Sequence, residues 1–128
     1  MKIEHLAIWV DDIELIRKFY MKYFKVTCSE RYNNPKRNFT SYFLSFGEDK
    51  TRIELMHIPD MKNSVNRQNL KGLAHFAISV RNKDKVDAFT ERLRADGFTI
   101  ASEPRTTGDG YYESAVLDPE GNCIEITV

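Results

Sequence analysis

Residues 73–80 read LAHFAISV and residues 3–10 read IEHLAIWV, so one pattern occurs twice in a chain of 128 residues. In both copies a histidine is followed by alanine at the second position, isoleucine at the third and valine at the fifth. Runs rich in β-branched and aromatic residues that alternate in polarity are typical of strands. Each run is followed at once by a polar segment and a helical pattern. The sequence therefore predicts one module, beginning with a strand, that is repeated.

In the first module, Asp11 or Asp12 is suited to cap a helix. Apolar residues then recur every three or four positions and predict one buried helix face: Ile13, Ile16, Phe19, Tyr20, Tyr23 and Phe24. The remaining elements are expected to be a weak strand over 26–31, a polar loop over 33–38 and a hairpin with strands over 39–46 and 51–58. The order is strand, helix and three strands, or βαβββ.

The second module repeats this order. Its helix is expected over 83–96, capped by Asn82 and ended by Gly97, with Val86, Phe89 and Leu93 facing inward. Strands are expected over 98–102, 111–118 and 122–128, with a tight turn over 119–121. We expect a single domain over 1–128, with module 1 over about 1–58, a linker over 59–71 and module 2 over about 72–128.

Composition limits the kinds of partner. Lysine plus arginine and aspartate plus glutamate both count 19, so the formal net charge is zero and we expect no nucleic-acid partner. No apolar run approaches the roughly 20 residues of a membrane span, so we expect no membrane partner and a cytoplasmic location. The chain has two cysteines, Cys28 and Cys123, too few for a disulfide framework or a thiolate metal cage. A small molecule is the expected ligand.

Aligning the modules places His75 on His5 and Glu125 on Glu54. Side chains alternate across a strand, so the neighbours of these four residues face the other way. Those neighbours are apolar in all four strands and are expected to pack on the helices: Leu6, Ile8, Val10, Ile53, Leu55, Phe76, Ile78, Val80, Ile124, Ile126 and Val128. The two histidines and two glutamates are therefore expected together on the opposite face. That face also carries small or mixed residues suited to a pocket: Ala7, Trp9, Met56, Ala77, Ser79 and Thr127.

A single histidine in a strand is more often a hydrogen-bonded core residue than a metal ligand. Two buried carboxylates without cations are costly, however, and Arg52 is the cation that shares the face of Glu54. A divalent cation held by His5, Glu54, His75 and Glu125 removes this cost. Imidazole and carboxylate ligands suit zinc, nickel, cobalt, manganese or iron(II), and four such ligands leave coordination positions for water or substrate.

At these residues the chain resembles the vicinal oxygen chelate superfamily, which includes glyoxalases, bleomycin resistance proteins and extradiol dioxygenases. The order His5, Glu54, His75, Glu125 and the string LDPEGNCIEI over 117–126 are similar to small bacterial glyoxalase I-like proteins. The resemblance covers the whole chain. It implies an α+β fold in which two tandem βαβββ modules form a curved mixed eight-stranded sheet with helices on the outer face. It also implies a homodimer, with each site inside one chain or shared between two.

The resemblance further implies a divalent-metal lyase or isomerase, similar to lactoylglutathione lyase. Such an enzyme transfers a proton through a metal-bound enediolate in the hemithioacetal of a 2-oxoaldehyde and a thiol. Glu125 is the expected general base, and Glu54 is expected to act from the opposite side. Substrate contacts are expected from Trp9, Met56 and Lys71. Trp9 and Ile58 stand where glyoxalase I usually carries arginine and asparagine, so glutathione is one of several candidate thiols.

Two other readings use fewer of these groups. His5, His75 and Glu125 alone match the two-histidine, one-carboxylate pattern, which suits an iron(II) dioxygenase, an epimerase or a thiol transferase. A non-catalytic antibiotic-binding protein would instead use stacking side chains, for which the candidates are Trp9, Tyr42, Tyr111 and Tyr112. Residues 105–110 (RTTGDG) are expected to form either a flap over the site or an ordinary surface loop.

Overall fold

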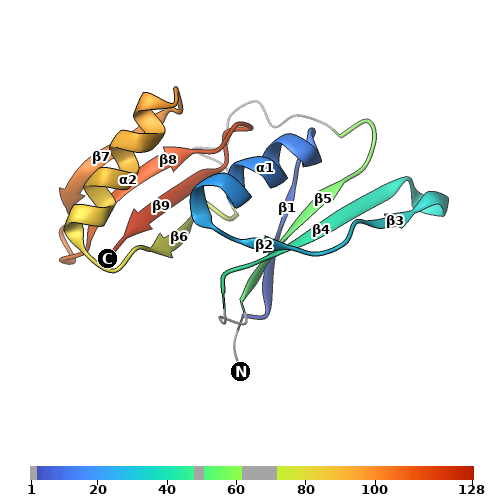
Figure 1. The fold of residues 1–128 in the computed structure, drawn as a ribbon, viewed down its shortest axis with the longest axis horizontal. Coiled ribbons are helices and arrows are strands. Elements are labelled where there is room, and N and C mark those ends of the chain that lie inside the picture. Colours follow the sequence, from blue (N-terminus) through green and yellow to red (C-terminus); the bar gives the residue numbers. More distant parts are fainter. Residues whose placement is uncertain (1–2, 48–50, 62–71) are drawn as a thin grey trace. The chain divides into compact units, whose positions relative to one another are not determined.

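A computed structural model describes residues 3–47, 51–61 and 72–128 of the chain. The chain divides into two compact units, residues 1–63 and 64–128, and each carries one copy of the repeated pattern (Figure 1). Most of the expected linker, residues 62–71, lies outside the described residues. Among the described helices, none has the length and apolar character needed to cross a membrane.

The first unit contains a five-stranded mixed sheet packed against one α-helix. Its elements are β1 (His5–Trp9), α1 (Ile13–Phe24), β2 (Thr27–Cys28), β3 (Tyr32–Asn34), the 3₁₀ helix η1 (Pro35–Arg37), β4 (Phe39–Ser45) and β5 (Arg52–His57). The strand order is β1-β5-β4-β2, and β3 pairs with the far end of β4. β1 runs parallel to β5, whereas the β4 pairings are antiparallel.

The second unit contains a four-stranded mixed sheet and the second α-helix. Its elements are β6 (Phe76–Ser79), α2 (Lys83–Ala95), β7 (Ile100–Thr106), β8 (Tyr112–Leu117) and β9 (Cys123–Thr127). The strand order β6-β9-β8-β7 repeats the order of the first unit, including the parallel pairing of β6 with β9. The fold is therefore α+β with a repeated βαβββ unit, as predicted.

The helix boundaries and caps agree with the predictions. Asp12 caps α1 by accepting from the backbone N–H groups of Glu14 and Leu15, and Asn82 caps α2 by accepting from that of Lys85. Gly97 follows α2 with φ +87°, a left-handed conformation that glycine adopts without strain. Five of the six predicted residues of α1 are buried, as are Val86 and Leu93 of α2, while Phe24 and Phe89 remain partly exposed.

Two strand assignments and the grouping of strands into sheets differ from the predictions. The polar segment expected as a loop forms β3 and η1, because Tyr32 to Asn34 pair in register with β4. β7 extends to Thr106, four residues beyond its expected end, because Arg105 and Thr106 pair with β8. The described strands also form two sheets of five and four strands, where eight strands in one sheet were expected. Each sheet is completed by hydrogen bonds within its own unit.

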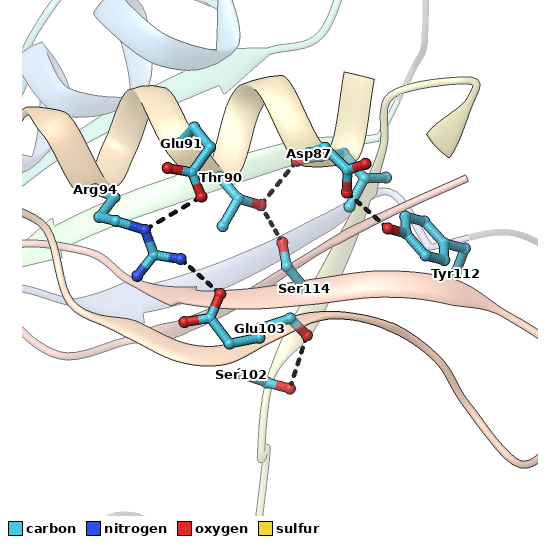
Figure 2. Close-up of polar contacts among 9 residues, drawn as sticks. Asp87, Thr90, Glu91, Arg94, Ser102, Glu103, Tyr112 and Ser114 are labelled. Carbon is cyan, nitrogen blue, oxygen red and sulfur yellow. Dashed lines mark hydrogen bonds and ion pairs between the residues drawn. The ribbon is translucent and has the colours of Figure 1, made fainter. Parts of the chain in front are cut away.

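A buried hydroxyl pair joins α2 to the sheet of the second unit (Figure 2). Thr90 donates to the carbonyl of Val86 at 2.7 Å, and the Ser114 hydroxyl lies 2.7 Å from Thr90 Oγ1. Because the Thr90 proton is used by Val86, Ser114 donates to Thr90. Both side chains are completely buried, so this bond fixes where α2 lies on β8.

We expect Thr90→Val to lower the free energy of unfolding by about 1–2 kcal/mol, because it leaves the buried Ser114 hydroxyl without an acceptor. Ser114→Ala in the Thr90→Val background should restore part of this loss, since both polar groups are then gone. Urea unfolding of the wild type, both single variants and the double variant measures the coupling. Strictly additive effects would contradict the proposed bond.

The first unit uses a different helix–sheet contact. The Tyr42 hydroxyl donates to Glu14 Oε1 at 2.7 Å, and Arg17 donates to Glu14 Oε2 at 2.9 Å. These bonds stabilise the carboxylate, so the pKa of Glu14 lies below its ordinary value, with Tyr42 as the main cause. The same carboxylate raises the pKa of the Tyr42 hydroxyl.

A carboxylate whose pKa is lowered in the folded state stabilises the protein above its unfolded pKa, and this contribution is lost as pH falls. We therefore expect Glu14→Gln to lower the unfolding free energy by about 1 kcal/mol near neutral pH and to flatten its decline below about pH 4.5. Denaturant unfolding at several pH values measures both effects. The control Glu30→Gln, at an exposed acid, should leave the pH profile unchanged.

Candidate metal centre

The first candidate pair of ligands lies on β1 and β5. These strands are parallel, and Ala7 stands directly opposite Glu54, so His5 and Glu54 lie two positions apart on the same face. Burial alternates along both strands, with Ile8, Ile53 and Leu55 buried on the helix side. His5 Nε2 lies 3.9 Å from Glu54 Oε2, and the two side chains are 40% and 16% exposed.

Glu4 orients the His5 ring. Its Oε2 lies 2.5 Å from His5 Nδ1, and its other oxygen accepts a hydrogen bond from Arg52. These two contacts, the histidine first, hold the pKa of Glu4 below its ordinary value. A His5 Nδ1–H that donates to Glu4 leaves Nε2 with a free lone pair toward Glu54. Histidines that bind metals are commonly held by a carboxylate in this way.

Arg52 does not neutralise Glu54 by an ion pair of the kind considered from the sequence. Its guanidinium instead pairs with Glu4 and lies over the Phe43 ring, 4.1 Å from the centroid. The Phe43 ring in turn contacts His5 edge-on, with centroids 5.5 Å apart. Arg52 and Phe43 thus support His5 rather than Glu54.

The second pair consists of His75, directly before β6, and Glu125 on β9. Ala77 stands opposite Glu125, as Ala7 stands opposite Glu54, and His75 Nε2 lies 3.1 Å from Glu125 Oε2. The side chains are 44% and 20% exposed, close to the values of the first pair. The internal repeat therefore places one imidazole beside one carboxylate in each unit, with the same register and similar solvent access.

Each pair supplies one nitrogen and one oxygen donor, the ligand types that suit zinc and other divalent transition metals. In the part of the chain that the structure describes, no group of three or more His, Cys, Asp or Glu side chains is arranged to hold a metal ion. One pair alone provides only two ligands. The donor set therefore fits a divalent metal if both pairs contribute to its coordination.

The residues predicted to contact or stack on a substrate differ in where the structure places them. Trp9 lies opposite Met56 on the face of His5 and Glu54, and its side chain is 46% exposed. Lys71 lies outside the described residues. Tyr42 and Tyr112 were wrong as stacking candidates, because both lie on the helix side of their sheets. Tyr42 donates to Glu14, and Tyr112 donates to Asp87 (Figure 2).

The segment 105–110 begins as strand rather than loop. Arg105 and Thr106 belong to β7, and a turn follows in which the backbone N–H of Thr107 donates to the Tyr111 carbonyl at 2.8 Å. Tyr111 itself is exposed. The chain between the two strands is thus a short, hydrogen-bonded turn.

Sequence reasoning missed two acids beside the pairs. Glu4 was passed over, although its position next to His5 was a visible signal. Glu113 stands opposite Thr127 on the face of Glu125 and lies 3.6 Å from Arg105. The alternation of β8 could have identified Glu113, but the Arg105 contact depends on the extension of β7.

Comparisons with known proteins agree with the α+β fold. A family model described as the Glyoxalase/Bleomycin resistance protein/Dioxygenase superfamily matches residues 2–126. The uncharacterized protein YqjT of Bacillus subtilis is 26% identical over 129 residues, which cover 97% of this chain and 96% of the relative. A glyoxalase family protein from Enterococcus faecalis has a TM-score of 0.81 at 21% identity, with 99% and 97% of the two chains covered. A glyoxalase I mutant from Zea mays has a TM-score of 0.80 at 23% identity, covering 98% of this chain and 44% of that one.

The repeated βαβββ unit with a mixed sheet defines the class of paired-module α+β proteins. The chain belongs to the Glyoxalase/Bleomycin resistance protein/Dioxygenase superfamily, whose model covers nearly its full length. This superfamily includes enzymes such as glyoxalase I and typically binds a divalent metal.

The contacts of His5 predict its tautomer in metal-free protein. In the neutral ring we expect the proton of His5 on Nδ1, because Glu4 accepts it. Long-range ¹⁵N–¹H NMR distinguishes the two tautomers. Glu4→Ala should shift His5 toward the Nε2–H form. His57 is an internal control, since its Nδ1 lies 3.0 Å from the Val10 carbonyl and should keep its proton in both proteins. An unchanged His5 spectrum would contradict the role of Glu4.

Proposed function

We propose that this chain is a glyoxalase I-like, divalent-metal-dependent lyase or isomerase, with His5, Glu54, His75 and Glu125 as the metal ligands. The observation that carries the proposal is the repeated His–Glu pair, found at equivalent register positions in both units. Two equivalent pairs of donors suit one ion with four protein ligands and open positions for substrate oxygens. Zinc, nickel, cobalt, manganese and iron(II) all match these donors.

The proposed reaction is a proton transfer at a carbon next to a carbonyl. A bound divalent ion supplies Lewis-acid stabilisation of the negative charge that develops on the substrate oxygens. Glu125 removes the proton from the carbon that carries the sulfur, and a proton is then delivered to the adjacent carbonyl carbon, with Glu54 acting from the opposite side of the substrate. His5 and His75 keep fixed positions, with Glu4 holding the His5 ring through Nδ1.

The proposed substrate is the hemithioacetal of a 2-oxoaldehyde with a thiol, and the product is a 2-hydroxyacyl thioester. Trp9 and Met56 are proposed to contact the substrate because they share the face of Glu54. Lys71 is proposed as a cationic contact to the substrate. Trp9 and Ile58 are apolar at positions where glyoxalase I usually has polar side chains, so thiols other than glutathione belong in the assay.

Family members often dimerise and bind small molecules. We propose a homodimer in the cytoplasm, with each metal site built within one chain or from one unit of each of two chains. Mixing two inactive proteins, one carrying His5→Ala and the other His75→Ala, separates these arrangements. Recovered activity indicates shared sites, because some mixed dimers would then contain one intact set of ligands.

Metal content and lyase activity test the proposed function together. Protein purified from metal-replete medium should carry about one divalent ion for each set of four ligands. It should also convert the methylglyoxal hemithioacetal of glutathione or of an alternative thiol. Protein with neither metal nor activity would contradict the proposal and favour a non-catalytic binding protein.

Substitution of the two glutamates separates their roles. We expect Glu125→Gln to reduce kcat by at least about 100-fold, because general-base catalysis is lost, while most of the metal remains bound. Lyase kinetics and elemental analysis measure both effects, with Glu103→Gln at an exposed acid of β7 as a control. Full activity in Glu125→Gln would refute the assignment of the base.

A second candidate is an oxygenase or thiol transferase that needs only His5, His75 and Glu125. The distance from histidine Nε2 to glutamate Oε2 is 3.9 Å in the first pair and 3.1 Å in the second. The longer distance at Glu54 favours this candidate, because a three-ligand site does not use Glu54. Glu54→Ala distinguishes the two functions. This substitution weakens metal binding in a four-ligand lyase but leaves metal binding intact in a three-ligand enzyme. Turnover by the three-ligand enzyme would depend on dioxygen or on another thiol acceptor.

A further inference from the structure

Three aromatic side chains form a continuous group on the candidate site face of the first unit. Trp9 is opposite Met56, Met56 is opposite Ser41, and Ser41 is opposite Tyr32, so Trp9 and Tyr32 belong to one row across the strands. Phe39 lies two positions from Ser41 on the same face of β4. We call Trp9, Phe39 and Tyr32 the aromatic group.

The rings contact one another while remaining accessible. The Phe39 centroid is 6.1 Å from that of Trp9 and 6.1 Å from that of Tyr32, at interplanar angles of 88° and 61°. Trp9 is 46% and Tyr32 is 55% exposed. Edge-to-face contacts of this kind hold the rings in position and leave ring surface open for an additional planar partner.

The aromatic character is not required by the fold. The equivalent row of the second unit contains Ser79, Thr127 and Glu113, with Arg105 at its edge. Its residues are small, polar or charged. The first unit therefore carries exposed rings where its structural repeat has hydrophilic side chains, beside the same kind of His–Glu pair.

Charge in the segment that carries Tyr32 and Phe39 also points to a type of ligand. Residues 31–47 contain three cations and no aspartate or glutamate, although the whole chain has no net charge. Two of these cations, Lys36 and Arg37, lie in η1, directly after the β3 residue that pairs with Phe39. This local excess of positive charge favours an anionic ligand.

We propose that Trp9, Phe39 and Tyr32 bind the planar aromatic ring of an anionic small molecule. The proposal deepens the proposed function and rests on it in one respect, because it takes the face of His5 and Glu54 as the substrate side. In that setting the aromatic group selects 2-oxoaldehyde adducts that carry an aryl substituent.

A small molecule fits the aromatic group better than a second protein chain. Three partly exposed rings present about 300 Å² of surface, since a complete aromatic side chain buries about 150–250 Å². A stable protein interface needs about 800 Å² on each partner. The exposed ring surface is therefore too small for a stable protein interface and is of a size that suits one aromatic ring of a ligand.

The chain contains a single tryptophan, so one indole N–H signal in a ¹⁵N–¹H NMR spectrum reports on Trp9. We expect 2-naphthoate to shift this signal saturably in metal-free protein. Decahydronaphthalene-2-carboxylate has the same charge without a planar ring, and 2-naphthylmethanol has the ring without the charge. Both should bind at least about 5-fold more weakly.

Matched variants assign the binding to the aromatic group. Tyr32→Ala and Phe39→Leu should each weaken 2-naphthoate binding about 5-fold, whereas Tyr111→Ala, at a tyrosine of similar exposure in the second unit, should not. Equal binding of all three probes, or an equal effect of Tyr111→Ala, would overturn the proposal. An indole signal that shifts with protein concentration alone would also overturn it, in favour of a second copy on this face.

Turnover separates this proposal from the proposed function. In metal-loaded enzyme, Tyr32→Ala should raise KM about 5-fold for the hemithioacetal of phenylglyoxal but not for that of methylglyoxal. Equal effects on both substrates would refute the aryl preference while leaving the lyase intact. A protein without lyase activity that still binds 2-naphthoate through Tyr32 would refute the proposed function and retain the aromatic subsite.

Discussion

The alternation of side chains along two parallel strand pairs is the constraint on which the rest of this structure depends. In β1–β5 and β6–β9, one face must bury aliphatic residues against a helix, so the residues between them are turned to the other face. A shift of register by one residue would move the histidines and glutamates toward the helices. The hydrophobic requirement of the core therefore also places the candidate metal ligands.

The two units satisfy this constraint with different interior chemistry. The first unit joins helix to sheet through Tyr42 and Glu14, and the second uses Thr90 and Ser114. In both helix–sheet contacts, the buried polar atoms are paired by hydrogen bonds. The His–Glu pair is nevertheless the same in each unit. The repeat has diverged where packing allows alternatives and has kept the donor groups.

The faces that carry the pairs have also diverged. In the first unit, His5 is surrounded by Arg52, Glu4 and Phe43. In the second unit, the small residue Ala115 lies across from Glu125. The row of residues next to the pair carries aromatic rings in the first unit and polar or charged side chains in the second. The two units therefore place similar His–Glu pairs in different chemical surroundings.

The sequence by itself determined the repeat, the two helices with their caps, the α+β class and the face shared by each histidine with its glutamate. All of these follow from local periodicity and from the spacing of residue types, which act over a few positions along the chain. Only the tertiary structure decided that Glu4 and Arg52 hold His5, that β3 pairs with β4, and that Tyr42 faces a helix while Tyr32 faces the candidate site. These outcomes depend on strand pairing between distant segments, where register, and not composition, selects the neighbours of each side chain.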